Sequence, residues 1–170
     1  MRKHRTSNIE HRTPNEKNEK AAESLALHDG DAGGRKYDLE NRLLEFASAV
    51  IDLAEKLPAT RAGNHVAGQI LRSGTSAYPN HGEAESAESR DDFIHKLKVC
   101  LKELRETRRW ARLVRFKDWT KNEATLLFVL NESDELIRIF VTGVKTAQMN
   151  ALTQKRKLNT SANYPSGEAG

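Results

Sequence analysis

The sequence is poor in cysteine, proline and aromatic residues, and it has no apolar run long enough to cross a membrane. Its one cysteine, Cys100, cannot form a disulfide framework within the chain. Because Cys100 sits among the apolar positions of a helical pattern, we interpret it as a core residue in a reducing compartment. The basic N-terminus lacks the apolar middle of a signal peptide. We therefore expect a cytoplasmic protein with no membrane partner.

Patterns for catalysis and metal binding are also lacking. His65, His81 and His95 do not show the i, i+4 spacing that places two zinc ligands on one helix face. Gly74 and Gly82 do not form a phosphate loop, and no strand–turn–helix elbow is present to expose a nucleophilic serine. We therefore expect no enzymatic activity, no catalytic or metal-binding residues and no cofactor.

Helical periodicity, by contrast, runs through most of the chain. Apolar residues recur at steps of three and four in segments near 37–56, 60–89, 91–117 and 120–149. Short connections separate these segments, and strand signals are almost absent. The pattern predicts an all-α protein, an antiparallel four-helix bundle with up-down-up-down topology.

Several residues mark where these helices begin or bend. Ser89, followed by two aspartates, is typical of a helix N-terminus. Thr120 and the glutamate three residues later have the spacing of a capping box, which predicts the start of the fourth helix. Pro79 removes one backbone hydrogen bond from the second helix, so we expect that helix to be kinked or broken around residues 78–82.

The two ends of the chain differ from the middle. Residues 1–36 are polar and poor in aromatic residues, and residues 151–170 contain a Lys-Arg-Lys cluster followed by small polar residues. Neither segment can bury enough apolar surface to offset the entropy of ordering. We therefore expect one domain, a bundle at residues 37–150, between a disordered N-terminal tail and a disordered basic C-terminal tail.

The third helix carries a line of cations opposite its apolar face. We call this line the basic stripe, and its members are Lys98, Lys102, Arg105, Arg109 and Arg112. Such a line is typical of a solvated helix face, but it also fits contacts with acidic helices of a neighbouring subunit or with phosphates. Trp119, in the connection after this helix, is expected to be exposed and able to stack on a base, whereas Trp110 borders the apolar face.

Charge is segregated along the chain. Residues 37–150 hold 17 basic and 17 acidic side chains, so the net charge of +4 comes from the two ends. The bundle as a whole therefore gives no bulk-charge argument for binding nucleic acid. An acidic turn precedes the basic stripe and consists of Glu83, Glu85, Glu88, Asp91 and Asp92. In a ring, the acidic turn of one subunit can face the basic stripe of the next, which favours a cyclic homo-oligomer.

The second and third helices resemble those of a known family. The 23S rRNA intervening-sequence proteins show roughly the pattern Q-x-x-R-S-x-x-S-x-x-x-N-x-x-E-A, which this chain matches with Gln69, Arg72, Ser73, Ser76, Asn80, Glu83 and Ala84. The similarity continues through Asp92-Phe93-Ile94 to Trp110 and covers about residues 37–150. The chain departs from the family at Tyr78 and Pro79.

This resemblance implies an assembly and a set of partners. Members of the family resemble antiparallel four-helix bundles that form pentamers, and their genes often lie in insertions within ribosomal RNA genes. Their biochemical role is largely undefined. Distantly similar proteins are accessory proteins of diversity-generating retroelements, which bind reverse transcriptase and RNA. The resemblance thus implies a likeness to homopentamers whose partners include RNA or an RNA-bound protein.

Three charged residues of this region are expected to serve the structure. Arg72 and Glu83 have small neutral neighbours, so we expect them to be partly buried and paired. We interpret them as an ion-pair network between the second and third helices, with Glu103 or Arg105 as partners. A contact with a ligand or with RNA is the alternative.

Two hypotheses of different class remain. In the first, the protein is a non-catalytic, RNA-associated accessory protein whose basic stripe and tails hold phosphates. In the second, it is an oligomeric scaffold that binds other proteins, and its charges are used between subunits. In the assembled ring, a basic stripe that lines an exposed channel or rim favours the first hypothesis, and a stripe buried against acidic residues favours the second.

Overall fold

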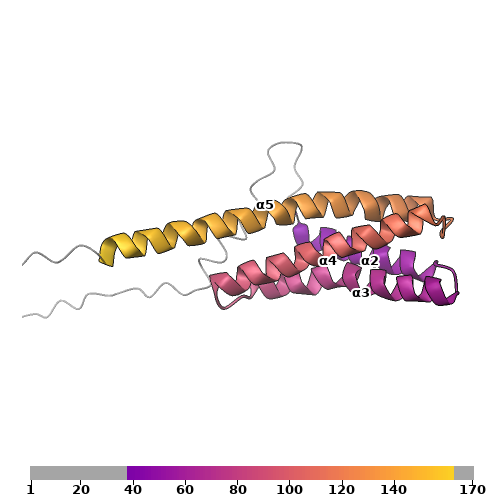
Figure 1. Cartoon of the computed structure of the whole chain (residues 1–170), viewed down its shortest axis with the longest axis horizontal. Helices are drawn as coiled ribbons and strands as arrows, with labels where there is room; N and C mark the ends of the chain where they lie inside the picture. The colour runs from indigo at the N-terminus through magenta and orange to yellow at the C-terminus, as the bar shows by residue number, and fades with distance from the viewer. Residues whose placement is uncertain (1–37, 163–170) are drawn as a thin grey trace, which may run out of the picture.

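The computed structural model describes residues 38–162, which form four α-helices and no strand (Figure 1). The helices are α2 (Leu39–Glu55), α3 (Arg61–Glu85), α4 (Arg90–Phe116) and α5 (Glu123–Ala162). The prediction of an all-α protein with four helices is therefore confirmed. The predicted N-terminal tail, Tyr37 and residues 163–170 lie outside the described residues.

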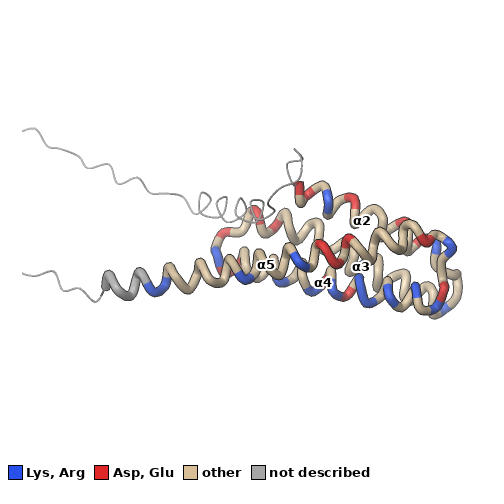
Figure 2. Tube along the Cα trace, turned by 90° about the horizontal axis from the view of Figure 1, so that it is seen from above, with Lys and Arg blue, Asp and Glu red and all other residues tan. Residues whose placement is uncertain are grey.

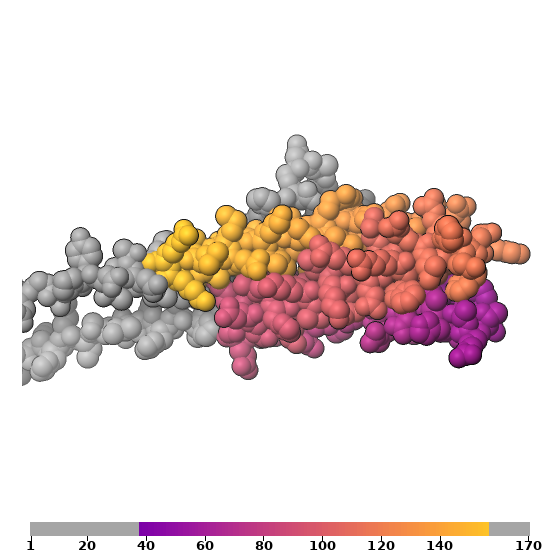
Figure 3. Space-filling model, in the orientation of Figure 1, coloured from indigo at the N-terminus to yellow at the C-terminus, as the bar shows by residue number. Residues whose placement is uncertain are grey.

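Consecutive helices lie side by side and reverse direction at each connection (Figure 1). Contacts between α3 and α4 pair Lys96 with Glu83 near one end of the interface and Thr107 with Ser73 farther along. Residue numbers rise on α4 as they fall on α3, so these two helices run in opposite directions. An ion pair of 2.7 Å between Arg42 Nε and Glu132 Oε1 joins α2 to α5. The space-filling view shows α4 and α5 packed against each other along one face (Figure 3).

The apolar stripes seen in the sequence meet in one core. Its largest fully buried side chains come from all four helices and are Phe46, Phe140, Leu43, Leu53, Ile70, Leu97, Leu104 and Leu136. Cys100 is also fully buried, and burial raises the pKa of its thiol to about 12. The thiol is therefore protonated and unreactive at neutral pH. Within the described residues, no helix is both long and apolar enough to span a membrane.

Side-chain caps fix the helix starts. Asp38, Thr60 and Ser89 each accept a hydrogen bond from the backbone N–H three residues later. The capping box predicted at Thr120 is wrong, because Asn122 Oδ1 accepts from the N–H of Thr125 and caps α5 instead. Thr120 Oγ1 accepts from the N–H of Asn122, so the threonine shapes the turn before the helix.

Helix α3 continues through Pro79 to Glu85, so the predicted alternative of a broken helix is wrong. Pro79 is exposed. In the same stretch, Asn80 Nδ2 donates to the carbonyl of Ser76 at 2.9 Å. The kink at this position stays a prediction.

Helix α5 extends farther than expected. The sequence predicted its end near Met149 and a disordered tail from residue 151, but the helix continues to Ala162. Residues 151–162 contain no glycine or proline, so nothing in this segment stops the helix. Figure 1 shows this part of α5 projecting beyond the ends of α3 and α4.

Gly74 gives α2 room to approach α3. A Cβ atom at this position would lie 2.4 Å from Val50 Cγ1 and 2.8 Å from Val50 Cγ2. We expect Gly74→Ala to lower the free energy of unfolding in urea by about 1–3 kcal/mol through overpacking. At exposed Gly68 a Cβ atom would meet nothing within 4 Å. We therefore expect Gly68→Ala to raise the free energy of unfolding by about 0.5–1 kcal/mol. Equal stabilisation by both variants would contradict the close contact between α2 and α3.

His81 is buried, and the pKa of its imidazole is shifted. It packs edge-on against Phe140, and burial lowers its pKa from 6.5 although the Glu85, Glu40 and Asp38 carboxylates oppose the shift. Glu85 Oε2 lies 3.8 Å from His81 Nδ1, but because the lowered pKa leaves the ring neutral at pH 7, this contact is not an ion pair there.

Protonation of His81 is consequently more favourable in the unfolded chain than in the folded one. The stabilisation from the neutral ring is complete above pH 6.5 and is lost as the pH falls through the folded-state pKa. We expect urea unfolding midpoints of the wild type to drop between pH 7.5 and 5.5, and His81→Leu to flatten this profile. A variant with an unchanged pH profile would contradict this assignment.

Candidate functional site

The basic stripe lies on the outward face of α4. All five of its side chains are exposed, and Figure 2 shows Lys and Arg recurring along the helix. Lys102 forms an ion pair of 3.4 Å with Glu103 of its own helix. Among the described residues, the other four members form no ion pair.

Other cations of α4 are used differently. Lys96 Nζ lies 2.5 Å from Glu83 Oε2 on α3, and this hydrogen bond raises the pKa of the lysine. Arg108 Nε lies 2.6 Å from Asp134 Oδ1 on α5. Cations that flank the core thus join α4 to its neighbours, whereas the stripe makes no contact of this kind. The stripe is therefore available to a ligand outside the single chain.

The acidic turn lies at the opposite end of α4 from Trp119, where α3 passes into α4. Glu83 forms an ion pair with Lys96, and Glu85 lies beside His81. The turn therefore retains Glu88, Asp91 and Asp92 without an ion pair among the described residues. This separation leaves the acidic turn and most of the basic stripe unpaired within one chain.

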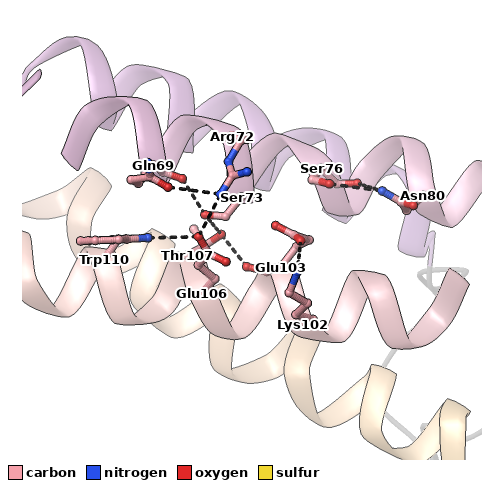
Figure 4. A network of polar contacts seen from close by, with 10 residues as sticks. All are labelled: Gln69, Arg72, Ser73, Ser76, Asn80, Lys102, Glu103, Glu106, Thr107 and Trp110. Atoms are coloured by element: carbon pink, nitrogen blue, oxygen red, sulfur yellow. Dashed lines mark hydrogen bonds and ion pairs between the residues drawn. The ribbon is translucent and has the colours of Figure 1, made fainter. Parts of the chain in front are cut away.

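The expected structural ion pairs exist with other partners. Arg72 Nη2 lies 3.6 Å from Glu106 Oε1 on α4 and donates to Gln69 Oε1 at 3.2 Å (Figure 4). Glu83 pairs with Lys96, and neither residue contacts Glu103 or Arg105. The expectation of partial burial is wrong, because the Arg72 side chain is 72% exposed and that of Glu83 is 55% exposed. Both sit at the edge of the α3–α4 interface, where water screens the pairs.

The motif that carries the family resemblance forms a polar seam between α3 and α4. Thr107 Oγ1 donates to Ser73 Oγ at 2.9 Å, and Ser73 donates to the Gln69 carbonyl at 3.0 Å (Figure 4). Trp110 Nε1 donates to Glu106 Oε1 at 3.4 Å. The seam joins small, hydrogen-bonded side chains of both helices. These motif residues therefore serve the packing of α3 against α4.

Trp119 lies in a cavity that the sequence did not predict. This cavity is a solvent-open hollow of about 600 Å³ where α3 begins and α4 ends. Its lining includes Arg61, His65, Trp110, Leu113 and Trp119. Trp119 was expected to be exposed but is half-buried. The lining residues come from segments about 50 positions apart, so the only signal in the sequence is the presence of two tryptophans nine positions apart near the end of the third helix.

A specific helix ending positions Trp119. Its N–H donates to the Val114 carbonyl at 3.2 Å, and the N–H of Asp118 donates to the Arg115 carbonyl at 3.1 Å. These are the two hydrogen bonds of a Schellman motif, in which the residue after the cap is left-handed. Asp118 has a φ of 50° accordingly. The motif turns Trp119 back onto the bundle, and Lys117 Nζ lies 6.0 Å from the centroid of its ring.

The described residues contain no group of His, Cys, Asp and Glu side chains that is arranged to hold a metal ion.

Comparison with known proteins agrees with the resemblance in the sequence. The 23S rRNA-intervening sequence protein family matches residues 35–141. A crystal structure of a protein of unknown function from the S23 ribosomal protein family of Bacteroides thetaiotaomicron matches with 36% sequence identity and a TM-score of 0.57. That match covers 63% of this chain and 95% of the other. No curated protein matches the chain. Because the family match covers more than half of the sequence, the chain belongs to the 23S rRNA-intervening sequence protein family.

Proposed function

We propose that the protein is a non-catalytic, homo-oligomeric accessory protein that holds RNA along the basic stripe. The observation that supports this proposal is that four exposed cations on one face of α4 form no ion pair among the described residues. The name of the family adds a link to ribosomal RNA.

The geometry of the stripe suits a polyanion. Lys98 and Arg112 are separated by 14 residues of a single helix, which at 1.5 Å per residue gives a line of charge about 21 Å long. Because the bundle is formally neutral, its attraction for phosphates is local and is screened over about 10 Å at 0.1 M salt. Binding to the stripe should therefore be salt-dependent.

An exposed apolar surface supports self-association. Leu44 and Ile51, 48% and 42% exposed, lie two turns apart on one face of α2. Leu71 on α3 is 40% exposed and lies one turn before Gly74. Gly74 in turn contacts Val50 of α2. This surface, formed by Leu44, Ile51 and Leu71, fits a second copy of the chain. Assembly through it leaves the basic stripe exposed, and the family resemblance implies five copies.

Light scattering after size-exclusion chromatography tests the assembly. We expect an oligomer for the wild type and a smaller species for Leu44→Glu combined with Ile51→Glu, because the charges would be desolvated in the interface. Met149→Glu, at a side chain that is 67% exposed on α5, is the control and should leave the mass unchanged. An oligomer that persists in the double variant would point instead to acidic-turn contacts with the basic stripe, as in the scaffold hypothesis.

Fluorescence anisotropy with a structured RNA tests the stripe. We expect the triple variant Arg105→Gln, Arg109→Gln and Arg112→Gln to weaken binding at low salt. Between about 50 and 200 mM salt, the slope of log K against log salt should become smaller by about 2–3, because each phosphate that is no longer neutralised by an arginine reduces the slope by nearly one unit.

A second triple variant controls for net charge. Lys56→Gln, Arg138→Gln and Lys145→Gln removes the same number of exposed cations from the C-cap of α2 and from α5. We expect this variant to bind RNA almost as the wild type does. Equal losses of RNA affinity in both variants would show that the effect arises from net charge alone. Full RNA binding by the stripe variant would overturn the proposal.

A further inference from the structure

The basic stripe ends at an exposed aromatic residue. Continuing from Arg109 and Arg112 by steps of three and four leads to Phe116, the last residue of α4. Phe116 is 87% exposed, more than any other large apolar side chain of the described residues. It contributes nothing to the core, so its position beside the cations needs another explanation.

The tryptophan cavity begins beside the same end of the stripe. Leu113, which lines the cavity, lies one turn after Arg109 on α4. The Trp110 and His65 rings meet edge to face at 6.2 Å between centroids and 81° between planes. The half-buried Trp119 is held by the Schellman motif at the helix end. The cavity is open to solvent and its lining is mostly apolar, so it offers a surface for a flat ring rather than an enclosed pocket.

Charge at the cavity favours an anionic ligand. Arg61 lines it and forms no ion pair among the described residues. The first turn of α3, which contains Arg61, has no acidic residue, whereas the first turns of α2, α4 and α5 each contain at least one. The positive end of the α3 dipole is thus uncompensated. Lys117 adds a second cation over Trp119, and the acidic residues at this end of the bundle are Asp118, Glu55 at the end of α2 and Glu123 at the start of α5.

We propose that this end of the bundle binds unpaired nucleotides. One base lies in the open cavity against Trp110 and Trp119, its phosphate lies near Arg61, and a neighbouring base stacks on Phe116. The inference rests on the proposed function for the source of the RNA, and it adds a preference for loops, bulges or ends. Bases in an A-form duplex are stacked inside the helix and cannot enter such a cavity, whereas single strands combine stacking on aromatic residues with backbone contacts to cations.

Tryptophan fluorescence reports directly on the cavity, because both tryptophans of the chain line it. The full chain is titrated with a blunt RNA duplex, with a hairpin of equal charge that carries an unpaired loop, and with a trinucleotide too short to span the stripe. We expect the hairpin and the trinucleotide to quench the emission and the duplex to leave it unchanged. The hairpin should bind more tightly than the duplex by about 5- to 150-fold for each stacked base.

Variants separate stacking from folding. Phe116→Ser should remove part of the hairpin preference, and because Phe116 is so exposed, the fold should be unaffected. Phe128→Ser, at a 40% exposed residue of α5, is the matched control and should keep the preference. Arg61→Gln should weaken trinucleotide binding, and Trp119→Leu should abolish most of the quenching.

The outcomes distinguish this inference from the proposed function. If duplex and hairpin bind equally without quenching, the stripe binds RNA and the inference is overturned. If neither long RNA binds but the trinucleotide quenches, the proposed function fails and the nucleotide site stands. Absence of quenching by all three probes overturns the inference. An emission change on dilution of the protein alone would show that a second copy fills the cavity, which also overturns it.

Discussion

The packing of α3 against α4 through small, hydrogen-bonded side chains sets the rest of the structure. The Thr107 hydroxyl donates to the Ser73 hydroxyl in a fully buried position. Each hydroxyl also bonds a carbonyl of its own helix, Glu103 for Thr107 and Gln69 for Ser73, so a slip of one residue between the helices would cost only the contact between the hydroxyls, about 0.5–1.5 kcal/mol. Gly74, the next residue, lets α2 approach from the other side. One short stretch of α3 thus fixes both neighbours in position and rotation.

The rotation of α4 decides which of its charges remain free. Lys96 and Arg108 flank the buried face and pair with α3 and α5, while the basic stripe points away from the core. Ser73 of the family motif lies in the polar seam, Ala84 in the core, and Arg72 and Glu83 pair with α4, so the motif identifies the fold more directly than the function. The residues on which the proposed function depends lie on the outward face of α4 and at its C-terminal end.

The features that depend on local residue patterns could be predicted from the sequence. The apolar period of α4, the cap at Ser89 and the burial of Cys100 follow from spacing and from neighbours within a few residues. The cap of α5 was missed because Thr120 and Asn122 are both good capping residues, and tertiary packing selects between them. The cavity could not be predicted, since Arg61 meets Trp110 and Trp119 only after α3 and α4 have packed.

Lysine acetylation read by mass spectrometry, with and without bound RNA, tests the central claim that the outward face of α4 binds RNA. The account predicts that RNA protects Lys98 and Lys102 and leaves Lys56 and Lys145 as reactive as before, since all four lysines are exposed in the single chain. Low acetylation of Lys98 before RNA is added, or an equal decrease in the acetylation of all four lysines on RNA binding, would contradict the account.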